Sequence, residues 1–240
     1  MITLFQPNSL FGLPNASPFC LKLEAFMHWQ SIKFTSKFAI PNQGPFQKVP
    51  FVEYKGTRIG DSSFIIDLLL KDNHIVYDQS LDLAKGHAFS RMMEEHVYWA
   101  IVYFRWMDQD VWPKLRDAFF GGIPFFVRPF IVNSAFKQAK SALKGQGMGR
   151  LSNKLILARI EQDLNALSEV LSQQDFICGD AMTHYDLSIW AILSQFMQCD
   201  LKIQLSNVTE NKPELKEYLK RVNQQLQPVW PNAEQFEIFS

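Results

Sequence analysis

The stretch Asn15-Ala-Ser-Pro-Phe-Cys-Leu-Lys-Leu-Glu24 follows a short apolar run, Ile2 to Phe5, and opens a segment with apolar side chains at helical spacing. Pro18 suits the first turn of a helix, where its missing N–H costs nothing, and Ser17 before it is a good N-cap residue. The unpaired N–H groups at a helix N-terminus stabilise an anion placed against them. The stretch therefore predicts a strand, a turn and a helix, with the turn suited to hold a thiolate.

An ordinary capped helix would also explain Ser17 and Pro18, but two further features follow in order along the chain. Lys48-Val-Pro-Phe-Val-Glu-Tyr54 predicts a strand that begins with an X–Pro bond, where a cis peptide would be a deliberate feature. Gly60-Asp-Ser-Ser-Phe-Ile-Ile66 then turns into another helical run, and Lys55-Gly56 between the two is a hairpin signal.

Two polar residues, Asp61 and Ser62, stand at the start of the helix that we expect from Ser62 to Leu70. Free N–H groups and a hydroxyl at this place can bind a carboxylate, while Asp61 can accept a hydrogen bond from an ammonium group. The same two residues are equally typical of an N-cap. From these residues alone both interpretations stay open.

The remaining segments divide the chain into a mixed part and a helical part. Lys33 to Phe38 alternates as a second strand, whereas Pro41 to Gln47 contains an internal glycine and proline and is too broken for a good helix. Lys71 to Ser80 is polar and has no clear period, and no strong strand signal follows it. We therefore expect one domain of strands and helices in residues 1–72 and an all-helical domain in residues 81–240.

Composition excludes several classes of protein. The formal net charge of the 240 residues is zero, which gives no overall electrostatic case for nucleic acid or an anionic membrane as partner. The three cysteines, Cys20, Cys178 and Cys199, are an odd number, which favours a reducing cytoplasmic location. They have no metal-ligand spacing, so we expect no metal site. No basic region precedes an apolar segment at the N-terminus, and no apolar run approaches the roughly 20 residues that span a bilayer. We expect no signal peptide and no membrane span.

The segment Leu83 to Trp106 predicts one long helix with an aromatic stripe. Large side chains recur there at alternating spacings of four and three, at Met92, His96, Trp99, Tyr103 and Trp106. A stripe of this kind is more often part of a core or a dimer interface than of a ligand site. His96 lies beside two glutamates but has no second His four residues later, so we predict no metal site there.

Two later segments carry signals of their own. Trp112 to Arg128 holds glycines and prolines among aromatic residues, which favours a loop or a broken helix. We expect its pairs Phe119-Phe120 and Phe125-Phe126 to pack between helices rather than to touch a membrane or cover a pocket. Thr183-His-Tyr-Asp-Leu187 is a capping-box pattern with Asp in place of the usual Glu, and it predicts a helix start that serves folding.

The Ser17 turn, the Val49-Pro50 bond, the Asp61-Ser62 pair and the late capping box occur in an order that resembles the glutathione transferase superfamily across nearly the whole chain. Ser17-Pro-Phe-Cys20 also repeats the Cys-Pro-aromatic-Cys pattern of thiol oxidoreductases, with Ser in place of the first Cys. A narrower resemblance, to the failed-axon-connections branch that is related to the metaxins, rests on four motifs. These are Ser17-Pro-Phe-Cys-Leu-Lys-Leu-Glu24, Asp61-Ser-Ser-Phe-Ile-Ile-Asp67, Glu94-Glu-His-Val-Tyr-Trp-Ala-Ile-Val-Tyr103 and Gln146-Gly-Met-Gly-Arg150.

The resemblance implies an α/β plus all-α fold, in which a thioredoxin-like, glutathione-binding domain is followed by a helical domain of the glutathione transferase type. By position, Ser17 would donate its hydroxyl to the glutathione sulfur. Val49, beside a cis Pro50, would offer backbone hydrogen bonds. Asp61 and Ser62 would hold the γ-glutamyl group. The glycyl carboxylate would meet Lys48 or Lys37. The broken segment before Lys48 departs from the helix that this fold usually has there, a region that often contacts the glycyl end of glutathione.

These implications support two hypotheses about function. The first is a cytoplasmic, homodimeric glutathione transferase that acts on an apolar electrophile, with Ser17 as the catalytic residue and Tyr98, Trp99 or Tyr103 lining an acceptor pocket. A hydroxyl cannot form the mixed disulfide that a first-position Cys would form, so Ser17 favours conjugation over disulfide exchange. Cys20 is the alternative nucleophile, but we expect it to be buried and inert. The second hypothesis is a non-catalytic interaction module of the metaxin type.

Overall fold

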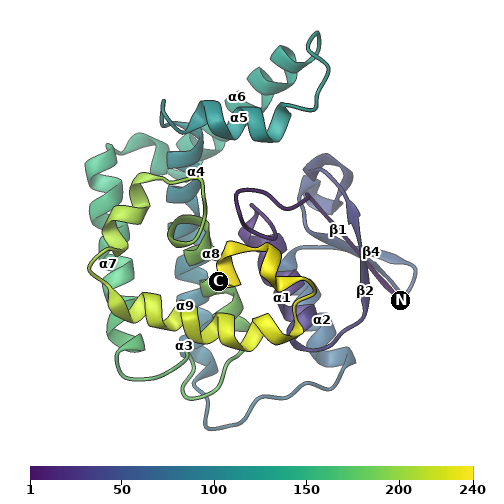
Figure 1. The fold of residues 1–240 in the computed structure, drawn as a ribbon, viewed down its shortest axis with the longest axis vertical. Helices are drawn as coiled ribbons and strands as arrows, with labels where there is room; N and C mark the ends of the chain where they lie inside the picture. The colour runs from purple at the N-terminus through teal and green to yellow at the C-terminus, as the bar shows by residue number, and fades with distance from the viewer. Residues whose placement is uncertain (240) are drawn as a thin grey trace.

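The N-terminal part of the computed structural model, which describes residues 1–239, is built on a sheet (Figure 1). Its strands are β1 (Ile2–Gln6), β2 (Phe34–Phe38), β3 (Phe51–Tyr54) and β4 (Thr57–Gly60), in the order β2-β1-β3-β4. β1 runs parallel to β2 and antiparallel to β3. Lys55 and Gly56 join β3 to β4 with positive φ values of 51° and 77°, as a two-residue hairpin turn requires, so the predicted hairpin is confirmed.

Two helices complete this mixed unit. α1 (Pro18–Trp29) connects the parallel strands β1 and β2, and α2 (Ser62–Asp72) follows β4. α1 packs against α2 and also against α8 (His184–Met197) of the helical part, and it is therefore buried on nearly every side. This arrangement of a mixed sheet and helices, followed by helices alone, confirms the predicted thioredoxin-like and all-helical fold classes.

The segment between β2 and β3 forms no regular helix. Two short 3-10 turns, η1 (Pro41–Gln43) and η2 (Pro45–Gln47), replace it, which confirms the prediction that this segment is broken. The Val49-Pro50 peptide bond that follows is cis, as expected.

The helical part begins with α3 after the connection at residues 73–82. Its elements are α3 (Leu83–Met92), η3 (Met93–Val97), α4 (Tyr98–Trp106), α5 (Trp112–Phe120), α6 (Arg128–Gln146), η4 (Met148–Arg150), α7 (Asn153–Leu171), α8, η5 (Gln204–Thr209) and α9 (Pro213–Leu226). The expected single helix from Leu83 to Trp106 is interrupted by the π-turn η3. The segment from Trp112 to Arg128 is a broken helix, as expected: α5 ends at Phe120 and α6 begins at Arg128. Among residues 1–239 no helix is both long and apolar enough to cross a membrane.

The start of α8 is a buried polar centre of the helical part. A capping box joins Thr183 and Asp186, as predicted, and Asp186 Oδ2 accepts the Thr183 N–H at 2.8 Å. The other oxygen, Oδ1, accepts the N–H of Ile177 at 2.8 Å and the hydroxyl of Tyr218 in α9 at 3.0 Å. One carboxylate therefore fixes the helix start, the preceding loop and α9 together.

The chain ends in a strap that crosses α8 and α1 (Figure 1). Short 3-10 turns cover residues 227–229, 233–235 and 237–239. The Trp230 ring lies 4.9 Å from the His28 ring of α1, and Phe239 stacks at 6.4 Å on the buried Trp190 of α8. The tail thus packs on both parts of the chain; the predicted boundaries at 72 and 81 stay a prediction, and Ser240 lies outside the described residues.

Candidate functional site

The Ser17 turn is held by a buried asparagine. The Ser17 N–H donates to Asn15 Oδ1 at 3.0 Å, while Asn15 Nδ2 donates to the carbonyl of Pro7 at 2.8 Å. Ser17 occupies the N-cap position of α1 with extended backbone angles, φ −95° and ψ 119°, yet its side chain makes no capping hydrogen bond. The half-buried hydroxyl is therefore not consumed by the helix. Sequence reasoning did not identify the role of Asn15.

A buried arginine of α4, in the helical part, also holds the Ser17 turn by hydrogen bonds. Arg105 is 5 % exposed, and its Nη1 donates to the carbonyl of Ala16 at 3.0 Å. Its Nη2 donates to the carbonyl and the side-chain Oε1 of Gln195 at 3.1 and 2.9 Å, whereas Nε has no partner. Within residues 1–239 no carboxylate lies within 4 Å of this guanidinium.

The charge of Arg105 is consequently uncompensated at short range. Burial lowers its pKa, but an arginine keeps its proton in a protein. Cys199 Sγ lies 3.6 Å from Nη2, and burial raises the pKa of that thiol, so it does not supply a counter-charge. A buried positive charge thus lies next to the peptide that precedes Ser17. Arg105 was not predicted as part of the site, because nothing in the sequence indicates its burial.

Cys20 is fully buried one turn after Ser17, which confirms the expected burial. Burial raises the pKa of its thiol far above the usual range, and the nearby Ser17 hydroxyl opposes part of this rise. On the far side of the turn, the ring of Tyr98 meets the ring of Phe19 edge-on at 4.8 Å. Tyr98 is therefore the member of the predicted acceptor set that contacts α1.

The backbone beside the cis peptide is available for pairing. Neither the N–H nor the carbonyl of Val49 makes a hydrogen bond within the described part of the chain. Val49 is half-buried and Pro50 is buried, and both lie just before β3, a central strand that pairs with β1 and β4. The peptide groups of Val49 can form main-chain hydrogen bonds with an extended peptide, which fits a tripeptide such as glutathione.

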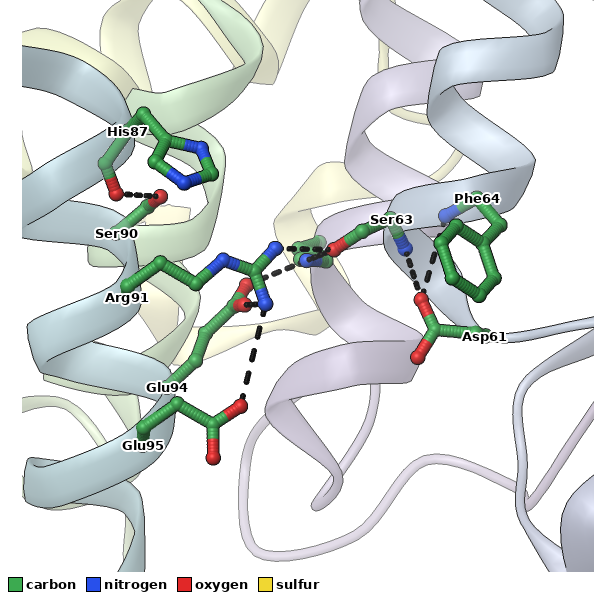
Figure 2. A network of polar contacts seen from close by, with 9 residues as sticks. Asp61, Ser63, Phe64, His87, Ser90, Arg91, Glu94 and Glu95 are labelled. Carbon is green, nitrogen blue, oxygen red and sulfur yellow. Dashed lines mark hydrogen bonds and ion pairs between the residues drawn. The ribbon is translucent and has the colours of Figure 1, made fainter. Parts of the chain in front are cut away.

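Asp61 is the N-cap of α2. Its Oδ1 accepts the N–H groups of Ser63 at 2.9 Å and Phe64 at 3.3 Å (Figure 2), while Oδ2 makes no hydrogen bond among residues 1–239. Its φ of 71° is a strained value for a residue with a side chain, and such strain persists where the surroundings impose it. Ser62 follows as the first, buried residue of the helix. Asp61 therefore uses one oxygen as a cap and keeps the other exposed.

A buried ion network adjoins Asp61 and was not predicted from the sequence (Figure 2). Ser63 Oγ accepts from Lys22 Nζ and from Arg91 Nη2, both at 3.0 Å. Lys22 and Glu94, each 3 % exposed at the side chain, pair at 2.5 Å, and Arg91 Nη1 lies 3.2 Å from the second oxygen of Glu94. The network links α1, α2, α3 and η3, and so fixes the Asp61 corner against the helical part.

Most of the aromatic stripe of α3, η3 and α4 packs on α7 and α5 and not on the Ser17 turn. His96 Nδ1 lies 2.5 Å from Asp163 of α7, and the hydroxyl of Tyr103 donates to Asn153 at the start of α7 at 2.9 Å. Trp106 stacks on Trp112 at 4.9 Å. Trp99 contacts Tyr98 edge-on at 5.7 Å. The stripe is therefore mainly a packing surface, and the structure brings Tyr98, but not Tyr103, to α1.

The two lysines that were predicted to meet the glycyl carboxylate, Lys48 and Lys37, are both exposed. Lys37 Nζ lies 5.9 Å from the centre of the Phe5 ring. Two surface hollows of about 530 and 510 Å³, one along α8 and α9 and one between α5 and α6, are not lined by Ser17, Val49 or Asp61. In the part of the chain that the structure describes, no group of three or more His, Cys, Asp or Glu side chains is placed to hold a metal.

Comparison with known families and proteins gives consistent matches. The glutathione S-transferase N-terminal domain matches residues 18–111 and the glutathione S-transferase C-terminal domain matches residues 160–222. The chain is 30 % identical to the isoprene-epoxide–glutathione S-transferase of Rhodococcus sp. (strain AD45), over 94 % of this chain and 99 % of that protein. It is 28 % identical to Failed axon connections of Drosophila melanogaster, over 96 % of this chain and 59 % of that protein.

More distant similarities extend the same pattern. Metaxin-2 of Homo sapiens is 20 % identical, over 85 % of this chain and 80 % of that protein. Among solved structures, a beta-etherase from Sphingobium sp. strain SYK-6 superimposes with a TM-score of 0.68 at 16 % identity, over 95 % of this chain and 98 % of that one. The structural similarity concerns the fold alone.

Proposed function

Because the chain belongs to the glutathione S-transferase family, we propose that it binds glutathione at the Ser17 turn and uses the thiolate of glutathione against an apolar electrophile. One observation carries this proposal above the others. The hydroxyl of Ser17 stands at the N-terminus of α1 but does not cap it, so it can donate to a bound sulfur.

The remaining contacts of the proposed site follow from groups that the fold leaves available. Val49 offers a free N–H and carbonyl beside the cis Pro50 to the peptide backbone of glutathione. Ser62 offers the N–H of the first turn of α2 and a hydroxyl to the γ-glutamyl carboxylate, and the exposed Oδ2 of Asp61 accepts from its ammonium group. Lys48 or Lys37 meets the glycyl carboxylate.

Three features of this chain stabilise a thiolate at the turn. They are the Ser17 hydroxyl, the N-terminus of α1 and the buried charge of Arg105. A hydrogen bond to a charged group contributes roughly 1.5 to 3 kcal/mol, which corresponds to about one to two pKa units. This is enough to bring a thiol with an ordinary pKa of about 8.5 close to neutrality, so the turn is physically sufficient for the role.

The electrophile of the Rhodococcus relative suggests a first substrate class. That protein is named for an isoprene epoxide, so a small apolar epoxide is the acceptor we propose to test. Glutathione supplies the nucleophilic thiolate: a sulfur–carbon bond forms, the epoxide carbon–oxygen bond breaks, and the oxygen takes a proton from water. Tyr98 contacts Phe19 of α1 from the side of α4, and Trp99 contacts Tyr98, so we propose the acceptor pocket there. The cytoplasmic location and the homodimer belong to the same proposal.

The second candidate function is a non-catalytic interaction module. Similarity to Failed axon connections and to metaxin-2 favours it, because it relates the chain to proteins whose names describe no reaction. The two functions share the fold and differ in whether the Ser17 turn carries chemistry.

The experiment that separates the two functions compares the wild type with the Ser17→Ala variant. The pKa of bound glutathione is followed by the ultraviolet absorbance of the thiolate, and turnover of an apolar epoxide is followed in parallel. We expect the bound thiol pKa to rise by about one to two units and turnover at neutral pH to fall roughly tenfold or more, with affinity largely kept. Equal turnover in both proteins would remove the proposed role of Ser17.

A further inference from the structure

The helical hairpin of residues 112–146, called the arm below, stands away from the body of the molecule (Figure 1). It consists of α5, the turn at residues 121–127 and α6. From residue 112 to residue 142 Leu115 is the single buried side chain, so most of the arm is not part of the core. The arm is attached at its base, where Trp112 stacks on Trp106 of α4 at 4.9 Å and Leu143 is buried.

The end of the arm exposes large aromatic side chains. Phe125 is 86 % exposed, Phe130 77 % and Phe126 65 %, and Phe119 and Ile131 are exposed beside them. The prediction that Phe125 and Phe126 pack between helices is therefore wrong, because the turn that carries them extends beyond every neighbouring helix. An exposed cluster of this kind marks an interaction surface in a folded protein.

The arm also carries a strong charge excess. Six of its residues are cations and one is an anion, namely Lys114, Arg116, Arg128, Lys137, Lys140, Lys144 and Asp117. Its net charge is therefore +5, and since the whole chain has a formal charge of zero, the remainder carries −5. The net charge of zero is therefore the sum of a basic arm and an acidic remainder. The overall charge gave no case for an anionic membrane, but the charge of the arm does.

The two properties are ordered along one face of α6. Phe130, Lys137 and Lys144 follow one another at intervals of seven residues, and Lys140 lies beside them, so they share a helix face. All of them are exposed. An aromatic end is therefore followed by a row of lysines toward the body. Aromatic side chains that enter the acyl boundary, with lysines at the level of the head groups, are the pattern of interfacial membrane binding.

We propose that the arm docks the protein on an anionic lipid surface, with the aromatic end inserted and Lys137, Lys140 and Lys144 on the lipid phosphates. Two arms of charge +5 repel each other, which disfavours arm-to-arm pairing of two copies of the chain. The docked arm would bring the Ser17 side of the molecule toward the lipid, since Phe119 of α5 lies 6.4 Å from Phe11 in the loop that leads to the Ser17 turn. The proposal does not depend on glutathione binding.

The test is co-sedimentation of the full chain with vesicles of phosphatidylcholine alone and with added phosphatidylserine. We expect binding to the mixed vesicles that weakens with salt. The variant Lys137→Gln, Lys140→Gln, Lys144→Gln should bind about a hundredfold more weakly, since each lysine near an anionic surface contributes roughly a factor of five. The matched control makes the same charge change off the arm at three exposed lysines, Lys71, Lys154 and Lys220, and should bind as the wild type does.

A second variant tests insertion. Phe125→Ser, Phe126→Ser, Phe130→Ser should lose the binding that the wild type retains at high salt, whereas Phe38→Ser, which removes a ring on β2 that is 62 % exposed, should not. These positions are exposed, so equal thermal midpoints verify that every variant is folded. Failure of the wild type to bind mixed vesicles, or equal binding by arm and control variants, would overturn the proposal. Self-association that the Phe variant abolishes, without vesicle binding, would assign the aromatic end to a second copy and overturn it as well.

Discussion

Two helix starts in this protein use the same kind of residue in opposite ways. At the start of α8 the buried Thr183 is joined to Asp186 by a capping box, and its hydroxyl donates to the Asp186 carboxylate at 3.0 Å. At the start of α1 the half-buried Ser17 makes no side-chain capping bond. The first start is closed by its own helix and serves stability. The second keeps its hydroxyl and helix N-terminus available, which is the condition for binding an anion from outside.

The surroundings of the two starts explain the difference. Asp186 at α8 satisfies the donors around it, so nothing is left for a ligand. At α1 the turn is fixed through backbone groups, by Asn15 at Ser17 and by Arg105 at Ala16. A turn that is held by its backbone can leave its side chain for chemistry. The predictions below test this contrast in order of decreasing effect.

The largest effect is expected from Asp186→Ala. The substitution leaves the N–H groups of Ile177 and Thr183 buried without their acceptor, and the hydroxyl of Tyr218 keeps only the backbone carbonyl of residue 186, at 3.2 Å. Each such group costs about 1–3 kcal/mol, so the free energy of unfolding should fall by about 4 kcal/mol in chemical denaturation. If the free energy of unfolding falls by no more than about 0.5 kcal/mol, as for a surface substitution, then Asp186 does not hold the start of α8, the preceding loop and α9 together.

The second prediction concerns pH at the first residue of α8. Burial lowers the pKa of His184 to about 4, and its Nδ1 lies 3.0 Å from the hydroxyl of Tyr77. The unfolded chain binds the proton near pH 6.5 and the folded chain only near pH 4, so stability is present above pH 6.5 and is lost as pH falls toward 4.

The difference between the folded and unfolded pKa of His184 should lower the free energy of unfolding by roughly 3 kcal/mol as pH falls from 6.5 to 4. His184→Gln should flatten the pH dependence of the unfolding free energy between pH 4 and 6.5 relative to the wild type. His28, whose pKa burial also lowers to about 4, remains in both proteins and serves as an internal reference. Parallel curves for the two proteins would refute the assignment to His184.

The third prediction concerns Arg105, which holds the turn at the start of α1. Arg105→Met removes the hydrogen bonds to Ala16 and Gln195 and the buried charge, and we expect about 2 kcal/mol lower stability together with a raised pKa of bound glutathione. Arg105→Lys keeps a charge without the planar fork of donors. If the charge matters for the thiolate, Arg105→Lys should restore part of the thiol pKa. Equal thiol pKa values in the Met and Lys variants would limit Arg105 to positioning the turn.

The smallest effects on stability are expected at the two N-cap residues themselves. Thr183→Ala removes the hydroxyl that donates to Asp186 at 3.0 Å and should cost about 1 kcal/mol, occasionally twice that. Ser17→Ala should cost less than about 0.5 kcal/mol, because no capping bond is lost. Paired denaturation curves under one condition measure the difference. A reversed order would mean that Ser17, and not Thr183, is the structural cap.

The features that were predictable from the sequence are those that local rules govern. The hairpin at Lys55-Gly56, the broken segment before Val49 and the capping box at Thr183 each depend on residues within a few positions of one another. The burial of Cys20 followed from its place one helical turn into an apolar helix. The aromatic stripe was also correctly assigned to packing, although a π-turn interrupts its helix.

The features that were missed depend on partners distant in the sequence. Lys22 sits in an apolar helix like any surface lysine, and only the fold reveals Glu94 and Ser63 beside it. Arg105 is buried because Ala16 and Gln195, remote along the chain, converge on it. Periodicity shows which side of a helix is apolar but not what covers it, and that is also why the exposure of Phe125 was not anticipated.

Calorimetric titration of the protein with reduced glutathione tests most directly whether the Ser17 turn is an open binding site. We expect saturable heat in the wild type and in Thr183→Ala, and its loss when Asp61 and Ser62 are both changed to Ala. The thermal midpoint of each protein, measured beside the titration, shows that the loss is one of binding and not of folding. Absence of heat and of thermal stabilisation in the wild type at millimolar glutathione would contradict an open binding site and favour the interaction module.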